Sequence, residues 1–241
     1  MATQMSMAAP PWPAAAEVIL SLLGLLFVSS TCSMSTPAIS FSELSALLEL
    51  KARLTNSAAS EAPLLRAWTS SNWNNSCKSW AGVTCAYVSG QSHVAGINLA
   101  GSGFAGSLTP LLGNLTFMSH LNLSSNLLTG GIPTELSRCS SLRVLDLNHN
   151  RLTGHIPPSL SSLSSLQVLR LCANNLSGHI PPSLFTNCTS LRKLSLCQNG
   201  LTGSITTLKI SPQLQRLYLW GNHVTGTFPP SLMPHPQRAR A

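Results

Sequence analysis

The sequence predicts an α/β solenoid of six stacked copies of one motif, because its apolar residues recur at a fixed interval. The copies begin at Val94, Met118, Leu142, Leu166, Leu191 and Leu214. In each copy the first, fourth, sixth and eleventh residues are apolar. One copy cannot bury this apolar face alone, so the copies must stack around a continuous core.

Each recurring position has a physical reason. Alternating apolar residues, such as Leu145 and Leu147, predict a short strand with one buried face. The thirteenth residue is always glycine, which permits backbone conformations that other residues resist. The ninth residue is asparagine in five copies, and its side chain can satisfy backbone groups where the chain turns. These asparagines are Asn126, Asn150, Asn174, Asn199 and Asn222. We expect a late leucine to pack the far side, at Leu112, Leu136, Leu160, Leu184 and Leu232.

The segments "LTGGIP", "LTGHIP" and "LSGHIP" resemble the plant-type leucine-rich repeat. The preceding "SELSALLELKARL" and "CKSWAGVTC" are similar to the N-terminal cap of plant receptor-like kinase and receptor-like protein ectodomains. The resemblance implies a curved leucine-rich-repeat solenoid with a parallel sheet on its inner face and a short helical N-terminal cap, outside the cell. It also implies a cap disulfide between Cys77 and Cys85.

We divide the chain into a signal peptide (1–33), a cap (34–93), six repeats (94–235) and a basic tail (236–241). The apolar run 18–28 is too short to span a bilayer and is followed by small residues, which indicates a signal peptide. An uncleaved anchor is the alternative interpretation.

The cap should begin with a helix. Ser40 and Glu43 fit a capping box. We expect the apolar face of this helix, with Trp68 and Trp80, to cover the open end of the first repeat. That face comprises Leu44, Leu47, Leu48 and Leu54.

Composition limits the partners. The chain has 14 Lys and Arg against 6 Asp and Glu, a net charge of +8, which favours acidic partners. Secretion argues against nucleic acid as a partner, and it allows disulfides to form. Cys139 and Cys188 stand where other copies have leucine, so we expect buried free thiols. Cys172 and Cys197 face outward on adjacent strands, which leaves either a disulfide or two thiols.

The sequence gives no support for catalysis. The histidines have no metal-ligand spacing, acids such as Glu135 and Asp146 are isolated, and no kinase motif follows the repeats. We therefore predict a protein that is not an enzyme and has no cofactor or metal.

A ligand site is expected on the inner face toward copies four to six, where basic and aromatic residues gather. The predicted ligand-binding residues are Arg170, Arg192, Lys193, Arg216, Tyr218 and Trp220. The competing interpretation is that these charges only make a sheet face soluble.

Five Asn-x-Ser/Thr sequons mark candidate glycosylation sites. They are Asn74, Asn114, Asn122, Asn175 and Asn187. Only Asn122 falls on the inner face. Either it is unmodified, or the ligand binds further along the solenoid.

The first functional hypothesis is an extracellular recognition module that binds a peptide or protein ligand, or a co-receptor, on the inner face. It would reach a membrane only through a partner or a lost C-terminal span. The alternative is a secreted cell-wall protein similar to polygalacturonase inhibitors, which cover a microbial enzyme. A second alternative is a truncated receptor fragment without independent function. In that case the last copy should expose Leu217, Leu219 and Leu232, and the chain should be poorly soluble.

Overall fold

The computed structural model describes residues 38–56, 63–206, 208–227 and 239–240. They belong to one compact unit, residues 36–241. The predicted signal peptide and Leu232 lie outside the described residues.

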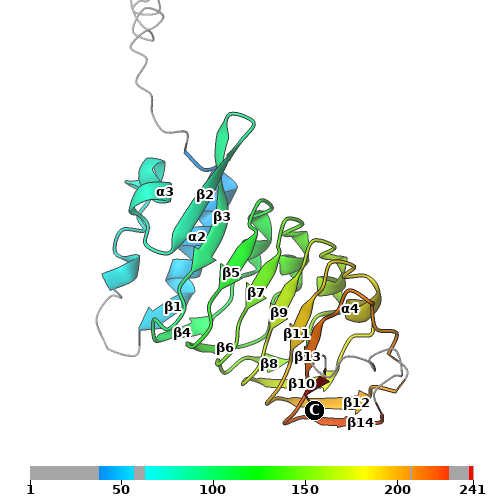
Figure 1. The fold of residues 1–241 in the computed structure, drawn as a ribbon. Helices are drawn as coiled ribbons and strands as arrows, with labels where there is room; N and C mark the ends of the chain where they lie inside the picture. The colour runs from blue at the N-terminus through cyan, green and yellow to red at the C-terminus, as the bar shows by residue number, and fades with distance from the viewer. Residues whose placement is uncertain (1–37, 57–62, 207, 228–238, 241) are drawn as a thin grey trace, which may run out of the picture. The chain divides into compact units, whose positions relative to one another are not determined.

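One face of this unit is an eight-stranded sheet to which each copy contributes one strand (Figure 1). The strands are β2 (Val83–Val88), β3 (Gln91–Asn98), β5 (His120–Asn122), β7 (Val144–Asp146), β9 (Val168–Arg170), β11 (Lys193–Ser195), β13 (Arg216–Tyr218) and β15 (Ala239–Arg240). They pair in this order, antiparallel between β2 and β3 and parallel from β3 to β15. In the register, Leu145 pairs with Leu169 and Leu169 with Leu194, so the fourth positions form one row.

Other strands form two smaller sheets along the edge of the repeats. The first has the order β1–β4–β6 and the second β14–β12–β10–β8. Their bounds are β1 (Leu54–Asn56), β4 (Phe104–Ser107), β6 (Leu127–Thr129), β8 (Thr153–Gly154), β10 (Asn175–His179), β12 (Gly200–Ser204) and β14 (His223–Thr225).

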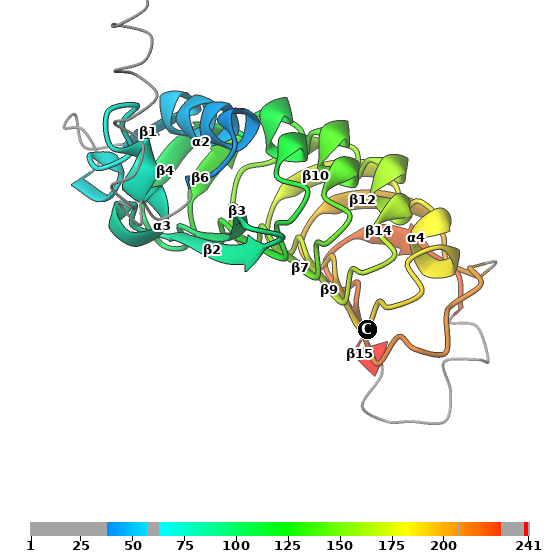
Figure 2. The same ribbon diagram turned by 90° about the horizontal axis from the view of Figure 1, so that it is seen from above.

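Short helices lie on the side opposite the eight-stranded sheet (Figure 2). They are η3 (Pro110–Asn114), η4 (Thr134–Arg138), η5 (Pro158–Ser162) and α4 (Ser183–Thr186). The late leucines Leu112, Leu136, Leu160 and Leu184 are fully buried here, as predicted. The leucine-rich solenoid predicted from the repeat pattern is therefore confirmed.

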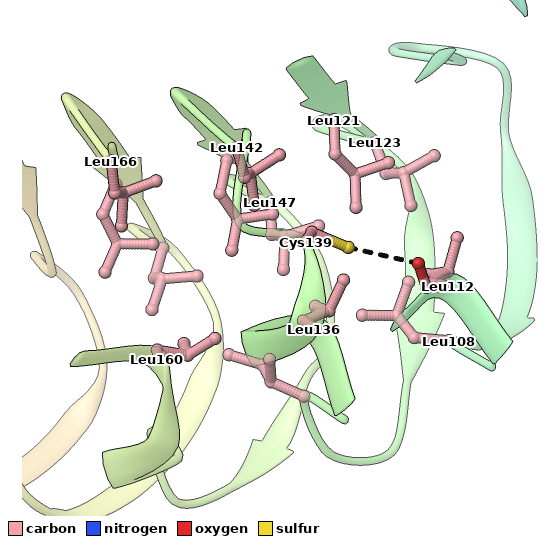
Figure 3. Close-up of a cluster of buried hydrophobic side chains, with 14 of the residues drawn as sticks. Leu108, Leu112, Leu121, Leu123, Leu136, Cys139, Leu142, Leu147, Leu160 and Leu166 are labelled. Carbon is pink, nitrogen blue, oxygen red and sulfur yellow. Dashed lines mark hydrogen bonds between the residues drawn. The ribbon is translucent and has the colours of Figure 1, made fainter. Parts of the chain in front are cut away.

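The core fills the space between the sheet and these helices (Figure 3). Cys139 packs among the leucines, and its thiol donates a hydrogen bond to the Leu112 carbonyl at 3.2 Å. Cys139 and Cys188 are free and buried, as predicted. Burial raises the pKa of Cys139 to about 12 and that of Cys188 to about 11, so both stay neutral thiols.

The ninth-position asparagines satisfy backbone groups, as predicted, and form a ladder along the repeats. Asn150 Oδ1 accepts the Leu128 amide at 3.0 Å, and its Nδ2 donates to the Leu123 and Leu147 carbonyls. Asn126, Asn174 and Asn199 repeat this pattern. Each asparagine thus satisfies backbone groups of its own copy and of the preceding one.

The cap begins with helix α2 (Phe41–Arg53), and its capping box of Ser40 and Glu43 is formed. Leu44 and Leu47 are buried, but the placement of Leu54 on the helix was wrong. The helix ends at Arg53, because Leu54 is extended and pairs with Gly106 of β4 as part of β1.

The rest of the cap is held by aromatic stacking and a disulfide. It contains η1 (Pro63–Leu65), η2 (Trp73–Asn75) and α3 (Ser76–Ser79). Trp68 and Trp80 are buried and stack with ring centroids 5.4 Å apart. Cys77 and Cys85 form a disulfide with 5.5 Å between their Cα atoms.

The expectation that the last copy exposes Leu217 and Leu219 is wrong. Their exposed fractions are 2 % and 4 %. One reason is that β15 continues the sheet beyond β13, with Leu217 opposite Ala239 and Tyr218 opposite Arg240. The edge of β13 is therefore paired in the structure.

Candidate ligand-binding face

The inner face is the side of the eight-stranded sheet that points away from the leucine core. It is formed mainly by the third and fifth residues of each copy, since side chains alternate along a strand. The third residues are Gly96, His120, Val144, Val168, Lys193 and Arg216. The fifth residues are Asn98, Asn122, Asp146, Arg170, Ser195 and Tyr218. The face therefore changes from small and neutral near the cap to cationic and aromatic in copies four to six.

Arg170, Lys193, Arg216, Tyr218 and Trp220 make up what we call the basic strip. The register places Lys193 beside Arg216 and Ser195 beside both Arg170 and Tyr218. Lys193 Nζ lies 5.5 Å from the centroid of the Tyr218 ring, within cation–π range. Four of the six predicted ligand-binding residues thus lie on three consecutive strands of the inner face.

The cations of this strip outnumber the nearby anions. Arg170 Nη1 donates to Asp146 Oδ2 at 2.7 Å, and the Asp146 side chain is only 8 % exposed. Burial, and then the charges of Arg170 and Arg216, lower the pKa of Lys193, while Asp146 opposes the shift. A cluster of like charges is costly for a fold to hold, and such clusters are more frequent at functional sites.

Trp220 lies at the end of the strip, next to a disulfide between copies four and five. Its side chain is 44 % exposed, although Trp is usually mostly buried. The possible disulfide between Cys172 and Cys197 is formed, with 4.5 Å between the Cα atoms. The Cys197 amide also donates to Cys172 Sγ at 3.0 Å. All three residues are the seventh of their copies, so the disulfide continues the row that ends at Trp220.

Arg192 is the predicted site residue that stands apart. It is exposed, but it immediately precedes β11 and Lys193. Successive side chains of an extended chain point to opposite faces. Alternation along the strand therefore places it outside the row of Lys193 and Arg216.

A second feature of the inner face was missed from the sequence. A hollow of about 220 Å³ extends from the cap to copy four. It is lined by Gly82, Thr84, Gly96, Ile97, Asn98, His120, Asn122, Val144, Asp146 and Arg170. The small third residue Gly96 was the available signal, because it contributes no side chain to the hollow and lets Thr84 pack closely, where a Cβ would lie 2.7 Å from Thr84 Oγ1.

The described residues contain no group of three or more His, Cys, Asp or Glu arranged to hold a metal ion. Among them, no helix has the length and apolar character needed to cross a membrane.

Comparison with protein families gives three matches along the chain. A leucine-rich-repeat N-terminal domain matches residues 42–86. Leucine-rich-repeat models match residues 118–139, 141–163 and 164–224. These segments coincide with the cap and with copies two to six.

Similar proteins are receptors of Arabidopsis thaliana. The LRR receptor-like serine/threonine-protein kinase GSO1 is 40 % identical over 99 residues, which are 41 % of this chain and 8 % of that protein. The crystal structure of the GASSHO1/SCHENGEN3 ectodomain in complex with CASPARIAN STRIP INTEGRITY FACTOR 2 is 38 % identical, with a TM-score of 0.69. The alignment covers 79 % of this chain and 22 % of that ectodomain.

The crystal structure of the BIR3–SERK2 complex matches over nearly the whole of one chain. It is 31 % identical with a TM-score of 0.61, and the alignment covers 76 % of this chain and 95 % of that one. By contrast, the chain spans less than a tenth of GSO1. The repeat register, the cap and these matches together show that the chain belongs to the plant-type leucine-rich-repeat family, among the ectodomains of receptor-like kinases.

Proposed function

We propose that this chain is an extracellular recognition module that binds a peptide or protein partner through the basic strip, and that the partner presents an acidic group to it. The observation that carries the proposal is the placement of Arg170, Lys193 and Arg216 on three consecutive strands beside the single carboxylate of Asp146. Tyr218 and the exposed Trp220 add apolar contact area at the same place.

The physical argument is one of charge compensation. Asp146 is already bonded to Arg170, so Lys193 and Arg216 have no carboxylate partner among the described residues. An incoming carboxylate or sulfate would relieve their mutual repulsion, and arginine can hold either group with two hydrogen bonds. Aromatic side chains next to arginine are the residue types that contribute most to binding energy.

The related structures support a binding role for such a face. The GASSHO1 ectodomain was crystallised with CASPARIAN STRIP INTEGRITY FACTOR 2, and BIR3 with SERK2. We therefore infer that this chain binds a secreted factor or a second ectodomain, and that it acts by binding rather than by catalysis.

An array of immobilised peptides tests the proposal. Each peptide carries Asp and Glu residues, and its matched control carries Asn and Gln at the same positions. We expect the chain to prefer the acidic set, with affinity falling as salt screens the charges. Arg216→Ala and Trp220→Ala should each weaken binding roughly 10- to 100-fold, because charged hydrogen bonds and buried aromatic contacts each contribute about 1.5–3 kcal/mol.

Arg138→Ala is the matched control, since Arg138 is an exposed arginine of η4, on the side opposite the inner face. Equal binding to acidic and neutral peptides, or equal effects of Arg138→Ala and Arg216→Ala, would contradict the proposal. Binding of a fungal polygalacturonase instead of a SERK2 ectodomain would favour the inhibitor-like alternative.

A further inference from the structure

The five sequons occupy different surroundings. Asn74 lies in η2, Asn114 ends η3, Asn175 begins β10 and Asn187 follows α4. Asn122 is the last residue of β5, on the inner face, and it lines the hollow. Its modification would change the ligand-binding face directly.

The hydrogen bonds of Asn122 leave its amide nitrogen available. Its Oδ1 accepts the Ser124 amide at 3.1 Å and the Ser124 hydroxyl at 2.8 Å. Within the described residues its Nδ2 donates to no protein acceptor. Asn126, four residues later, is the opposite case, because its Nδ2 donates to the carbonyls of Leu99, Leu123 and Ser124. A substituent on Asn122 Nδ2 therefore breaks no hydrogen bond of the fold.

The walls of the hollow also suit a sugar. Beside Asn122, the hollow is lined by the polar residues Asn98, Thr84 and His120, which can form hydrogen bonds with sugar hydroxyls. The apolar residues Ile97 and Val144 and the ion pair of Asp146 with Arg170 complete the lining. The sequon serine, Ser124, is only partly buried, so the whole motif lies at the surface.

We propose that Asn122 carries an N-linked glycan whose first sugar occupies the hollow and leaves Lys193, Arg216, Tyr218 and Trp220 of the basic strip as the open part of the inner face. The inference rests on the proposed function, since it requires an extracellular chain. The reaction is the ordinary transfer of an oligosaccharide to an asparagine side chain. The Asn122 amide nitrogen forms a bond to the anomeric carbon of an oligosaccharide carried on a lipid diphosphate. The bond from that carbon to the diphosphate breaks, and the amide loses one proton.

The geometry separates the glycan from the strip. In the sheet order, β11 and β13 lie three and four strands from β5. At about 4.8 Å per strand, Lys193 and Arg216 are roughly 14 and 19 Å from the row of Asn122. The first sugar therefore reaches Asp146 and Arg170 at the edge of the hollow, but not Lys193 or Arg216.

Glycopeptide mass spectrometry of the full chain, secreted from plant cells, tests site occupancy. Enzymatic release of the glycans in ¹⁸O-labelled water converts each occupied asparagine to a labelled aspartate. We expect the label at Asn122 and at Asn187, the exposed control sequon. Label at Asn187 without label at Asn122 would overturn this inference and leave the proposed function intact. Label at neither site would also overturn this inference, whereas failure of the cells to secrete the chain would contradict the extracellular assignment in the proposed function.

Chemical modification of histidine tests where the sugar lies. We expect His120 to react several-fold more slowly with diethyl pyrocarbonate in the glycosylated chain than in Asn122→Gln, while the exposed His223 reacts equally in both. Ser124→Ala provides a second variant that removes the sequon, should Asn122→Gln fail to fold. Equal reactivity of His120 with and without the glycan would refute occupation of the hollow.

Discussion

Two residues in every copy have left-handed backbone, and only one of them was evident from the sequence. The thirteenth is always glycine, with φ between +76° and +113°. The eighth is also left-handed, but it is glycine only at Gly101 and Gly221. The other copies have Ser125, His149, Ala173 and Gln198, at φ from +53° to +55°.

The eighth position was missed because its conformation is imposed by neighbouring copies. The Ala173 amide donates to the Cys197 carbonyl at 2.9 Å, and the Gln198 amide donates to the Trp220 carbonyl at 2.8 Å. Such bonds between copies can hold a residue in a conformation that costs about 1–2 kcal/mol. A single copy of the motif contains no sign of them.

A matched pair of glycine substitutions separates backbone strain from steric overlap. Gly154 and Gly178 have nearly equal φ, +78° and +77°. A Cβ at Gly154 would meet nothing, whereas one at Gly178 would overlap the His155 ring. We expect Gly154→Ala to lower the free energy of unfolding by about 1–2 kcal/mol, and Gly178→Ala to lower it further. Denaturant titration measures both, and equal losses would show that His155 does not pack as described.

At the scale of elements, the cap helix is joined to the sheet by one carboxylate. The exposed fraction of Glu43 is 2 %, and its Oε2 accepts the Ser40 amide and hydroxyl at 2.9 and 2.8 Å. Its Oε1 accepts the Val94 amide of β3 at 2.9 Å. The capping box was readable because its residues are three apart. The bond to Val94 was not readable, because it spans 51 residues.

This double role predicts an unequal response to two alanine substitutions. Ser40→Ala removes part of a helix cap and should cost about 1 kcal/mol. Glu43→Ala also leaves the buried Val94 amide without its acceptor, so we expect a loss of roughly 2–4 kcal/mol. Thermal or denaturant unfolding of both variants gives the comparison. A Glu43→Ala loss no larger than that of Ser40→Ala would show that the contact with Val94 adds nothing.

The other elements also differ in whether they could be predicted from the sequence. The inner strands were predictable, because Leu145 and Leu147 alternate with polar residues. The antiparallel pair β2–β3 and the small edge sheets were not, because their pairing depends on how neighbouring segments meet. For the candidate site, the sequence predicted that Lys193, Arg216 and Tyr218 share a face. The contact of Lys193 with Tyr218 and the Cys172–Cys197 bond depend on side-chain placement and required the structure.

At the scale of the whole molecule, the charges of the basic strip oppose folding. The pKa of Lys193 is lowered by burial and by Arg170 and Arg216, so the fold disfavours its charged form. The unfolded chain therefore binds this proton more tightly. The loss of folding stability that this charge causes is complete at neutral pH. It is relieved as pH rises toward the ordinary lysine pKa of 10.5.

Lys193→Gln should accordingly separate stability from binding. At pH 7 we expect its free energy of unfolding to equal or exceed that of the unmodified chain, because a disfavoured charge is removed. We also expect its affinity for acidic peptides to fall, and the salt dependence of binding to become weaker. Denaturant titration and peptide binding at two salt concentrations measure these effects. A variant that is less stable and binds equally well would contradict this account of the strip.

The asparagine ladder has a consequence for how the length of this protein can change. Each asparagine side chain bonds only to its own copy and to the one before it, and its backbone amide donates to the next copy, so the junctions between copies present the same acceptors and donors. Removal of residues 142–165, the third copy, would bring β9 of copy four beside β5 of copy two. The new junction would have the same hydrogen-bonding groups as the one that it replaces. Gain or loss of a whole copy is thus a small structural event that moves the charged end of the sheet closer to the cap or further from it.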